Sequence, residues 1–391
     1  MIDFPFQNEC YSCTICASVC PVAAISFSKD LLPLIDTDKC VDCGKCESDC
    51  IRLNPNFGHP PKEENGYIAK NINDEIRNLS SSGGVFYALA DYVLNQGGYV
   101  CGCIYDEKLF PKHVISNSRE DVSKMRGSKY VTSDLRGCIN EIIRLLDSNH
   151  KVLFSGVPCQ CAAIDRIAEN HNREDLIIVS VICHGSIDRS IWASYLNHEQ
   201  KSSGKRIIAV SMRNKDKGWS NYGLKLDFED GSSHISFRNE DGFFLRAYTS
   251  GLLERDRCLT CEYKEPYIHA DMILGDGWGM DLLYPDFADE KGISVILVRT
   301  KKGEKLLGEL SEELTVEAIA PELIYQNNSR ISTPAPLDVD RNLFLKKYQK
   351  HPEAIARYCK WYASLSLVNR LRRKIKQKMA SRIYNRPKEF K

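Results

Sequence analysis

Two short runs of cysteines are the residues of this sequence whose spacing most clearly implies chemistry. The first run reads CYSCTICASVCP over residues 10–21, and the second reads CVDCGKCESDCI over residues 40–51. The chain has 391 residues and 17 cysteines, and its first residues, MIDFPFQNECYSC, contain neither the basic nor the apolar segment of a secretory signal. We therefore expect a cytoplasmic protein, in which closely spaced cysteines indicate metal ligands or redox groups rather than a disulfide framework.

The spacing within each run separates two kinds of metal site. Structural zinc usually takes its four ligands from two separated C-x2-C pairs. Each run here is C-x2-C-x2-C-x3-C, the spacing of bacterial ferredoxins, in which the fourth cysteine of each run ligates the other cluster. We therefore predict a ferredoxin-type domain with two 4Fe-4S clusters over residues 1–58, and zinc sites or buried free thiols are the alternatives. The predicted ligands are Cys10, Cys13, Cys16 and Cys50 for one cluster and Cys20, Cys40, Cys43 and Cys46 for the other.

The segment between the two runs predicts the small hairpin of such a domain, because AISFS and LPLID flank a polar turn. The two runs differ in one respect, since Pro21 follows the first and Ile51 follows the second. All eight ligands are present, so this difference concerns the local turn rather than the clusters.

The rest of the chain predicts alternating strands and helices after a linker over residues 53–66. We expect an α+β fold, in which the small dicluster domain is followed by a mixed α/β flavin-binding core over residues 75–330 and a helical basic tail over residues 341–391. Within the core we expect an antiparallel meander. Its strands are predicted at residues 206–214, 222–228 and 233–237, and further strands at 99–105, 151–156, 175–185, 270–276 and 292–300.

Two motifs of the core contain groups suited to binding an anion. SSSGG (80–84) precedes a predicted helix, where free N–H groups could receive a phosphate, although an ordinary N-cap would also explain it. RGSKY (126–130) supplies a glycine, a hydroxyl and two cations, and its alternative is a solvated loop.

Three further motifs contain cysteines. SGVPCQ (155–160) and ICHG (182–185) follow predicted strands, at the place where open α/β sheets bind ligands. CLTC (258–261) is a single C-x2-C, which could be half a zinc site or a redox pair. With Cys159 and Cys183 it would complete four thiolates, enough for a third cluster, but spacing alone does not bring these pairs together.

Taken in order, these motifs resemble the family of coenzyme F420 hydrogenase/dehydrogenase beta subunits, which includes proteins similar to 7-hydroxymethyl chlorophyll reductase. The resemblance covers about residues 76–300 and is carried by SSGGVFYALADYVLNQGG, MRGSKYVTSDL, VLFSGVPCQ, ICHG, RCLTCEYK and ADMILGDGWGM. Members of that family are iron–sulfur flavoproteins that bind FAD and a 4Fe-4S cluster, and several carry a fused ferredoxin domain. In GDGWGM (275–280) the chain has Gly277 where the family often has an aromatic residue, which would leave more room for a ligand.

The resemblance implies roles for individual residues. Cys159, Cys183, Cys258 and Cys261 would ligate a cluster of the core. The residues implied to hold the flavin are Ser81, Ser82, Gly83, Gly84, Gly127, Ser128, Lys129 and Tyr130. His184 would donate a proton near the flavin, or else end a strand without a chemical role. Cys101, Cys103 and Cys138 are more simply explained as core packing, and Cys161, two positions after Cys159, is an alternative ligand.

Charge sets further bounds on the partners of the chain. The formal net charge is +1, so no nucleic-acid partner is expected. Residues 341–391 contain 16 Lys and Arg against 2 Asp and Glu. The apolar residues of this tail recur at three or four positions, which predicts a basic amphipathic helix suited to anionic lipid or an acidic partner, with a plain solvated helix as the alternative.

These observations predict a flavin-dependent oxidoreductase. Single electrons would pass between a ferredoxin-like partner, the 4Fe-4S clusters and FAD, and the flavin would reduce or oxidise a small organic substrate such as coenzyme F420, another ring compound or a sugar. The alternative is an electron-transfer subunit of a larger complex with no substrate site of its own.

Overall fold

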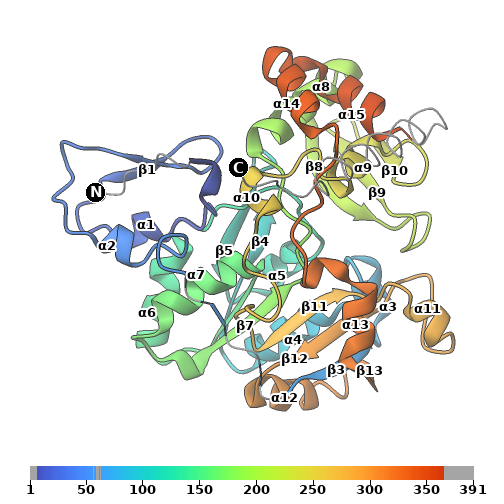
Figure 1. Cartoon of the computed structure of the whole chain (residues 1–391). Coiled ribbons are helices and arrows are strands. Elements are labelled where there is room, and N and C mark those ends of the chain that lie inside the picture. The colour runs from blue at the N-terminus through green and yellow to red at the C-terminus, as the bar shows by residue number, and fades with distance from the viewer. Residues whose placement is uncertain (1–6, 56, 59–60, 62, 365–391) are drawn as a thin grey trace, which may run out of the picture.

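The computed structural model describes residues 7–55, 57–58, 61 and 63–364. It contains a small N-terminal unit, a central mixed sheet with helices on both faces, and a third part built on a three-stranded sheet (Figure 1). No helix in the described ranges is both long and apolar enough to cross a membrane. The fold therefore has the mixed α/β core that the sequence predicts.

The N-terminal unit repeats one backbone conformation in its two cysteine runs. In each run a four-residue helix, α1 (Ile15–Ser18) or α2 (Lys45–Ser48), begins at the residue before the third cysteine. The second and fourth residues after the first cysteine are left-handed in both runs, with φ of 54° and 62° at Ser12 and Thr14 and of 50° and 72° at Asp42 and Gly44. The predicted hairpin is confirmed, because β1 (Ile25–Phe27) pairs antiparallel with β2 (Pro33–Ile35).

Eight strands form the central sheet, in the order β13-β3-β12-β11-β7-β6-β4-β5. β4, β6, β7 and β11 run parallel to one another, and the remaining neighbours pair antiparallel. The bounds are β3 (Asn65–Asn71), β4 (Tyr99–Tyr105), β5 (Pro111–Ser116), β6 (Val152–Gly156), β7 (Leu176–Val181), β11 (Met272–Asp276), β12 (Ser294–Val298) and β13 (Leu314–Ile319).

The sheet begins earlier in the chain than the sequence predicts. We expected a linker up to residue 66 and a core from residue 75, but β3 lies between β12 and β13. Its sequence, NGYIAKN, has a single strongly apolar residue, yet Ile68 and Ala69 are fully buried. Because both ends of the segment are polar, it does not form the apolar run by which a buried strand is recognised in a sequence.

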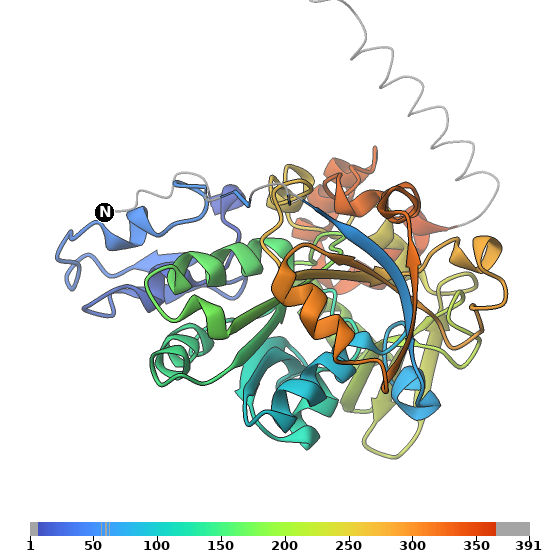
Figure 2. The same cartoon turned by 90° about the horizontal axis from the view of Figure 1, so that it is seen from below.

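Helices cover the two faces of the sheet because alternate strand residues point to opposite sides. Leu153, Ile177 and Val179 pack with α4 (Val85–Asn95), α5 (Arg119–Met125) and α12 (Lys301–Gly308). Val152, Phe154, Leu176 and Ile178 pack on the other side with α6 (Cys138–Asp147) and α7 (Pro158–Ala168). The N-terminal unit lies beside α6 and α7 (Figure 2). The shorter helices of the core are α3 (Asp74–Asn78), α10 (Asp256–Leu259), α11 (Met280–Leu283) and α13 (Pro321–Asn327).

The third part confirms the predicted meander. β8 (Ile207–Asn214), β9 (Gly223–Phe228) and β10 (Ser233–Phe237) form an antiparallel sheet in the order β10-β9-β8. Four helices share its apolar core: α8 (Arg189–Ser203), α9 (Phe243–Thr249), α14 (Arg341–Lys350) and α15 (Ile355–Ala363). The first part of the predicted basic tail is thus helical and packed against this core, and the predicted amphipathic helix beyond residue 364 lies outside the described residues.

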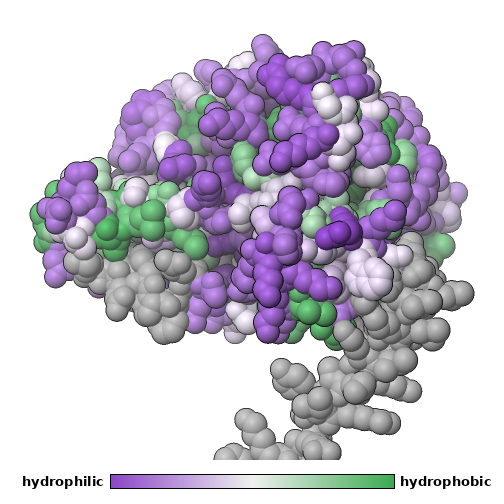
Figure 3. Space-filling model, turned by 90° about the horizontal axis from the view of Figure 1, so that it is seen from above, coloured by the Kyte–Doolittle hydropathy of each residue, from purple (hydrophilic) through white to green (hydrophobic). Residues whose placement is uncertain are grey.

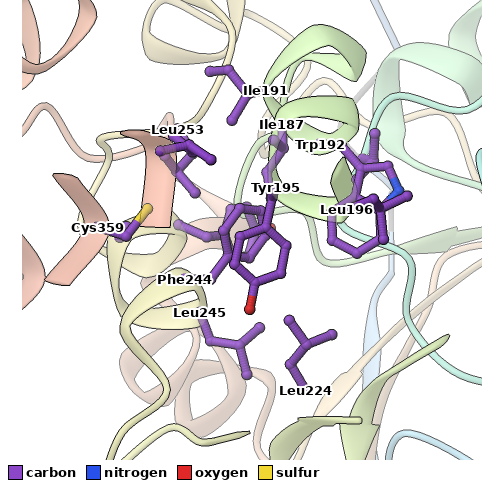
Figure 4. Packing of buried hydrophobic residues seen from close by; sticks show 14 of the residues in the cluster. Ile187, Ile191, Trp192, Tyr195, Leu196, Leu224, Phe244, Leu245, Leu253 and Cys359 are labelled. Carbon is purple, nitrogen blue, oxygen red and sulfur yellow. The ribbon is translucent and has the colours of Figure 1, made fainter. Parts of the chain in front are cut away.

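Aromatic packing holds these helices together (Figure 4). The rings of Tyr195 and Phe244 stack with centroids 4.0 Å apart, and the Trp192 ring lies 5.6 Å from that of Phe244. The Trp192 indole donates a hydrogen bond to the Leu109 carbonyl at 2.8 Å. This cluster joins the meander to the C-terminal helices.

We expect Phe244→Ala to lower the free energy of unfolding by about 3–5 kcal/mol, because it removes a buried ring and leaves a cavity. Urea denaturation followed by circular dichroism measures this change. Leu282→Ala is the control, because Leu282 is 83 % exposed, and it should change stability by less than about 0.5 kcal/mol. Equal effects of the two substitutions would contradict the packing described here.

Candidate functional site

The first group of cysteines lies at the outer end of the N-terminal unit. Cys20, Cys40, Cys43 and Cys46 line one cavity, together with the apolar side chains of Val22, Ile25, Ile35 and Val41. Three of these cysteines come from the second run and one from the first. This grouping of one cysteine from the first run with three from the second is the one that the ferredoxin spacing predicts. We call these four residues the outer group.

Cys10, Cys13, Cys16 and Cys50 form the inner group. Cys13, Cys16 and Cys50 are buried, and burial raises the pKa of Cys16 to about 12, with the charges of Cys10 and Cys50 raising it further. The pKa of Cys13 is raised by burial and then by Cys10, Cys16 and Cys50, so the four thiols lie near one another. α1, which contains Cys16, packs against α2, which contains Cys46, so the two groups adjoin.

A third group of four cysteines meets at the edge of the central sheet. Cys159, Cys183, Cys258 and Cys261 line one cavity, although they are distributed over about a hundred residues of sequence. β6 and β7 are adjacent parallel strands, so their carboxyl ends place Cys159 and Cys183 side by side. α10 and the turn after it bring Cys258 and Cys261 to the same cavity. We call these residues the core group.

The surroundings of these thiols suit anionic sulfur ligands. Backbone N–H groups donate to sulfur from Ser12 to Cys10 and from Ala24 to Cys20, both at 3.3 Å. In the core group, the N–H of Gly185 donates to Cys183 at 3.3 Å and the N–H of Ser186 donates to Cys258 at 3.4 Å. Such bonds orient ligand thiolates and tune the potential of a bound cluster.

Three cations lie at the core group. Arg255, Arg257 and Lys264 line the cavity. Burial raises the pKa of the Cys183 and Cys261 thiols, and the charge of Lys264 opposes that rise in both. Lys264 is fixed by hydrogen bonds of 2.7 Å to the carbonyls of Cys183 and Arg330. The cavity thus combines four thiols with positive charge that would balance thiolates.

The inner group is held directly by the segment that carries Cys258 and Cys261. The Arg255 guanidinium donates to the carbonyl of Cys10 at 2.9 Å and to that of Tyr11 at 3.3 Å. Arg257 donates to the Tyr11 hydroxyl and lies 4.3 Å from the centroid of its ring. Tyr11 follows an inner-group cysteine in sequence and also lines the core cavity. The two groups therefore share a wall.

Tyr263 fastens the other side of the inner group. Its hydroxyl donates to the Ile51 carbonyl at 2.8 Å, and its ring lies edge-on to Tyr11 with centroids 5.0 Å apart. Ile51 is only 1 % exposed and packs with Tyr11, Cys13 and Tyr263. This explains why the second run ends with isoleucine rather than proline, because the position is filled by a core contact.

The residues implied to hold a flavin only partly converge. The hydroxyls of Ser81 and Ser128 lie 2.8 Å apart, so the SSSGG and RGSKY segments meet. Gly83 packs so closely that an added Cβ would lie 2.4 Å from the Ala69 carbonyl oxygen, and its N–H donates to the Ser294 hydroxyl at 2.9 Å. Gly84 is the left-handed N-cap of α4, which has no side-chain cap. The turn thus presents the N-terminus of an 11-residue helix.

Other members of this set have partners within the protein. The Ser82 hydroxyl donates to the Ile293 carbonyl. The Lys129 ammonium turns back to the end of α5, where it donates to the carbonyls of Arg126 at 2.9 Å and of Gly127 at 3.1 Å. Tyr130 stacks on Tyr248 with ring centroids 4.6 Å apart. Lys129 therefore binds the carbonyl groups at the C-terminal end of α5, a contact that the RGSKY motif alone does not reveal.

The structure adds residues of the meander that sequence reasoning missed. Arg213 makes a bidentate pair with Asp276 at 2.9 and 3.0 Å and also donates to the Ser81 carbonyl at 3.1 Å. Its guanidinium lies 4.0 Å from the centroid of the Tyr222 ring. Trp219 and Trp278 stack with centroids 4.5 Å apart. The alternation of basic and aromatic residues in MRNKDKGWSNYG is the signal in the sequence that could have found this cluster.

The structure revises the expectation about Gly277 and describes the surroundings of His184. The space beside Gly277 is filled by Ile293, because an added Cβ would lie 2.6 Å from its side chain. Gly277 therefore allows the close approach of Ile293 and leaves no extra room for a ligand. His184 is partly buried, and burial lowers its pKa to about 4 although the charge of Asp276 opposes this. The ring is neutral at neutral pH, and its role as a proton donor stays a prediction.

Three of the four other cysteines considered are buried in the interior, whereas Cys103 is half-buried. Cys101, Cys138 and Cys161 are buried, and the Cys138 thiol donates to the His113 carbonyl at 3.1 Å. A search of the described ranges finds no cluster of three His, Cys, Asp or Glu side chains that could hold a single metal ion. The outer and core groups each line a cavity.

Comparison with known proteins identifies the family of this chain. Residues 67–140 match the family described as coenzyme F420 hydrogenase/dehydrogenase, beta subunit N-term, and residues 149–322 match the C terminus of the same beta subunit. These two segments make up well over half of the chain, and the chain belongs to this family. The predicted resemblance is thus confirmed for the core.

The chain is also similar to individual proteins. The chain is 22 % identical over 340 residues to a subunit of the F(420)H(2) dehydrogenase of Methanosarcina mazei, covering 79 % of this chain and 84 % of that protein. It is 25 % identical over 347 residues to an uncharacterized protein of Methanocaldococcus jannaschii, covering 76 % and 85 % respectively. A solved structure of the F420-reducing NiFe hydrogenase complex from Methanosarcina barkeri contains a chain that is 21 % identical, with a TM-score of 0.48, covering 76 % of this chain and 94 % of that one.

We expect Tyr263→Phe to loosen the attachment of the N-terminal unit, because it removes a buried hydrogen bond and leaves the Ile51 carbonyl unpaired, at a cost of about 1–3 kcal/mol. Hydrogen exchange should become faster around residues 10–16 and 50–54 and stay unchanged in the meander. Tyr267→Phe is the matched control, because Tyr267 is 44 % exposed. Identical exchange in both variants would contradict the attachment.

Proposed function

We propose that this protein is an iron–sulfur flavoprotein that passes electrons between a redox partner and an organic substrate. The observation that carries the proposal is the meeting of Cys159, Cys183, Cys258 and Cys261 in one cavity beside the inner group. Each of the three groups supplies four thiols, the number that a 4Fe-4S cluster requires. Membership in an oxidoreductase family supports the same conclusion.

In this proposal the chain's residues hold three 4Fe-4S clusters in a row. The outer group is the most open, the inner group lies behind it, and the core group follows on the far side of Tyr11 and Tyr263. Clusters exchange one electron at a time and a flavin exchanges one or two, so the two kinds of cofactor together would couple a one-electron partner to a two-electron substrate. Arg255 and Arg257 fix the wall between the inner and core groups.

The proposed FAD site lies at the start of α4. The free N–H groups of this uncapped helix terminus suit a phosphate, and Ser81 and Ser128 add hydroxyls beside it. Arg213 reaches this turn through the Ser81 carbonyl and is held by Asp276. Asp276 ends β11, next to β7 in the sheet, so the proposed flavin site and the core group lie at the same sheet edge.

The substrate would be coenzyme F420 or another ring compound or sugar, and electrons could flow in either direction. The alternative is an electron-transfer subunit without a substrate site of its own, and this is favoured by the Methanosarcina mazei relative, which is named as one subunit of a dehydrogenase. Steady-state substrate turnover by the isolated chain distinguishes the two. Turnover supports the enzyme, and electron exchange with a partner protein alone supports the subunit.

We expect Cys258→Ser together with Cys261→Ser to reduce bound iron from about twelve to about eight atoms per chain, because one of three four-iron clusters loses two ligands. Anaerobic purification followed by iron and acid-labile sulfide analysis measures this. Cys103→Ser, in β4 and not among the twelve cysteines of the three groups, is the control and should keep all the iron. Unchanged iron in the double variant would rule out the core cluster, and zinc without sulfide would rule out all three.

We expect Ser81→Ala together with Ser128→Ala to weaken FAD binding about tenfold, because two hydroxyl contacts worth about 0.5–1.5 kcal/mol each are lost. Flavin released from the denatured protein, and its retention during dialysis, give the readout. Ser123→Ala, in α5, is the matched control. FAD retention equal to that of the unaltered protein would place the flavin elsewhere.

A further inference from the structure

The outer end of the N-terminal unit has an unusual amount of exposed apolar surface. Val41 is 60 % exposed and Val22 is 39 % exposed, although valine is usually buried. Both side chains line the cavity of the outer group, and Pro21 and Ala23 beside them are also exposed. Figure 3 shows hydrophobic residues gathered on this lobe. We call Pro21, Val22, Ala23, Val41 and Cys43 the outer face.

The outer face also gives the most direct access to any of the three cysteine groups. Of the twelve cysteines in these groups, all of which lie in the described part of the chain, Cys43 alone is exposed. The inner group is enclosed by Tyr11, Ile51 and Tyr263. The four cysteines of the core group are half-buried, and the segment with Arg255 and Arg257 lines their cavity together with Tyr11. An electron carrier that approaches from solvent therefore meets the outer group first.

The charge around the outer face is negative. Residues 36–49 contain five acidic side chains and two lysines, and one of the acids, Asp49, lies 4.0 Å from Arg166 of α7 and not at the outer face. One lysine, Lys39, is paired with Asp36 at 2.9 Å, and Asp42 lines the cavity itself. The core group differs, because the charged side chains that line its cavity are cations. The outer face thus has an apolar centre with an acidic rim.

We propose that the outer face docks a one-electron redox protein whose own docking surface has an apolar centre and a basic rim. This inference rests on the proposed function, since the outer group must hold a cluster for the contact to transfer electrons. The step moves one electron between the outer cluster and the metal centre or flavin of the partner, and no bond forms or breaks. Interfaces of electron-transfer proteins are small, and complementary charge speeds their encounter.

The test compares a basic with an acidic carrier on the full-length protein. Calorimetry at low salt should detect binding of cytochrome c, a basic one-electron carrier, and little binding of an acidic plant-type ferredoxin. Added salt should weaken the cytochrome c complex, because exposed charges are screened. After anaerobic reduction of the chain, stopped-flow mixing should show oxidation by cytochrome c with the same salt dependence.

Val41→Lys should weaken cytochrome c binding about tenfold, because it places a like charge in the apolar centre of the contact. Ile72→Lys is the matched control, since Ile72 is 64 % exposed and directly follows β3 of the central sheet. It should change binding less than about twofold. Asp38→Lys should weaken binding and reduce its dependence on salt, which would show that the rim contributes charge.

Other outcomes would overturn the proposal. Equal losses in Val41→Lys and Ile72→Lys, stronger binding of the acidic carrier, or binding of neither carrier would each exclude a basic partner at this face. A dimer of the unaltered chain in sedimentation that Val41→Lys disrupts would assign the face to self-association instead. Iron and sulfide analysis separates this failure from that of the proposed function, because missing clusters refute both, whereas intact clusters with unchanged binding refute the docking face alone.

Discussion

The contact between the segment 255–263 and the two cysteine runs is the interaction on which the rest of this structure depends. Arg255 and Arg257 hold the first run through the carbonyls of Cys10 and Tyr11 and the Tyr11 hydroxyl, and Tyr263 holds the end of the second run through Ile51. The same segment contributes two of the four core cysteines. One short stretch of chain therefore positions two groups of thiols at once. This explains how cysteines that are far apart in sequence form adjoining sites.

The central sheet supplies the second constraint. The carboxyl ends of its parallel strands bring the core group and the proposed flavin site to the same end of the sheet. The parallel strands β6 and β7 end at Gly156 and Val181, and a cysteine of the core group follows each of them. β11 ends at Asp276, which is itself a candidate site residue. The antiparallel strand β12 begins at this edge, where Ser294 accepts the N–H of Gly83. The topology thus gathers residues for redox chemistry at the edge where α/β sheets usually bind ligands.

The sequence allowed accurate prediction where chemistry forces a pattern. The crossed grouping of the two cysteine runs, the hairpin between them and the meander follow from spacing and alternation, and the structure has all three. Features that depend on distant contacts could not be predicted in this way. β3 is too polar to be recognised from its sequence alone. Lys129 binds the end of α5, the helix that precedes it, and the space beside Gly277 is filled by Ile293. Arg213 became a candidate only when the fold brought it to Ser81 and Asp276.

The burial of Ile51 and Tyr263 has a consequence for how such proteins can evolve. One side of this unit forms a buried junction with the core, where Ile51 is 1 % and Tyr263 0 % exposed. Removal of the unit would uncover an apolar area on the core, and a different unit fused in its place would lack the matching side chains. Substitutions on one side of the junction are therefore constrained by the residues on the other side.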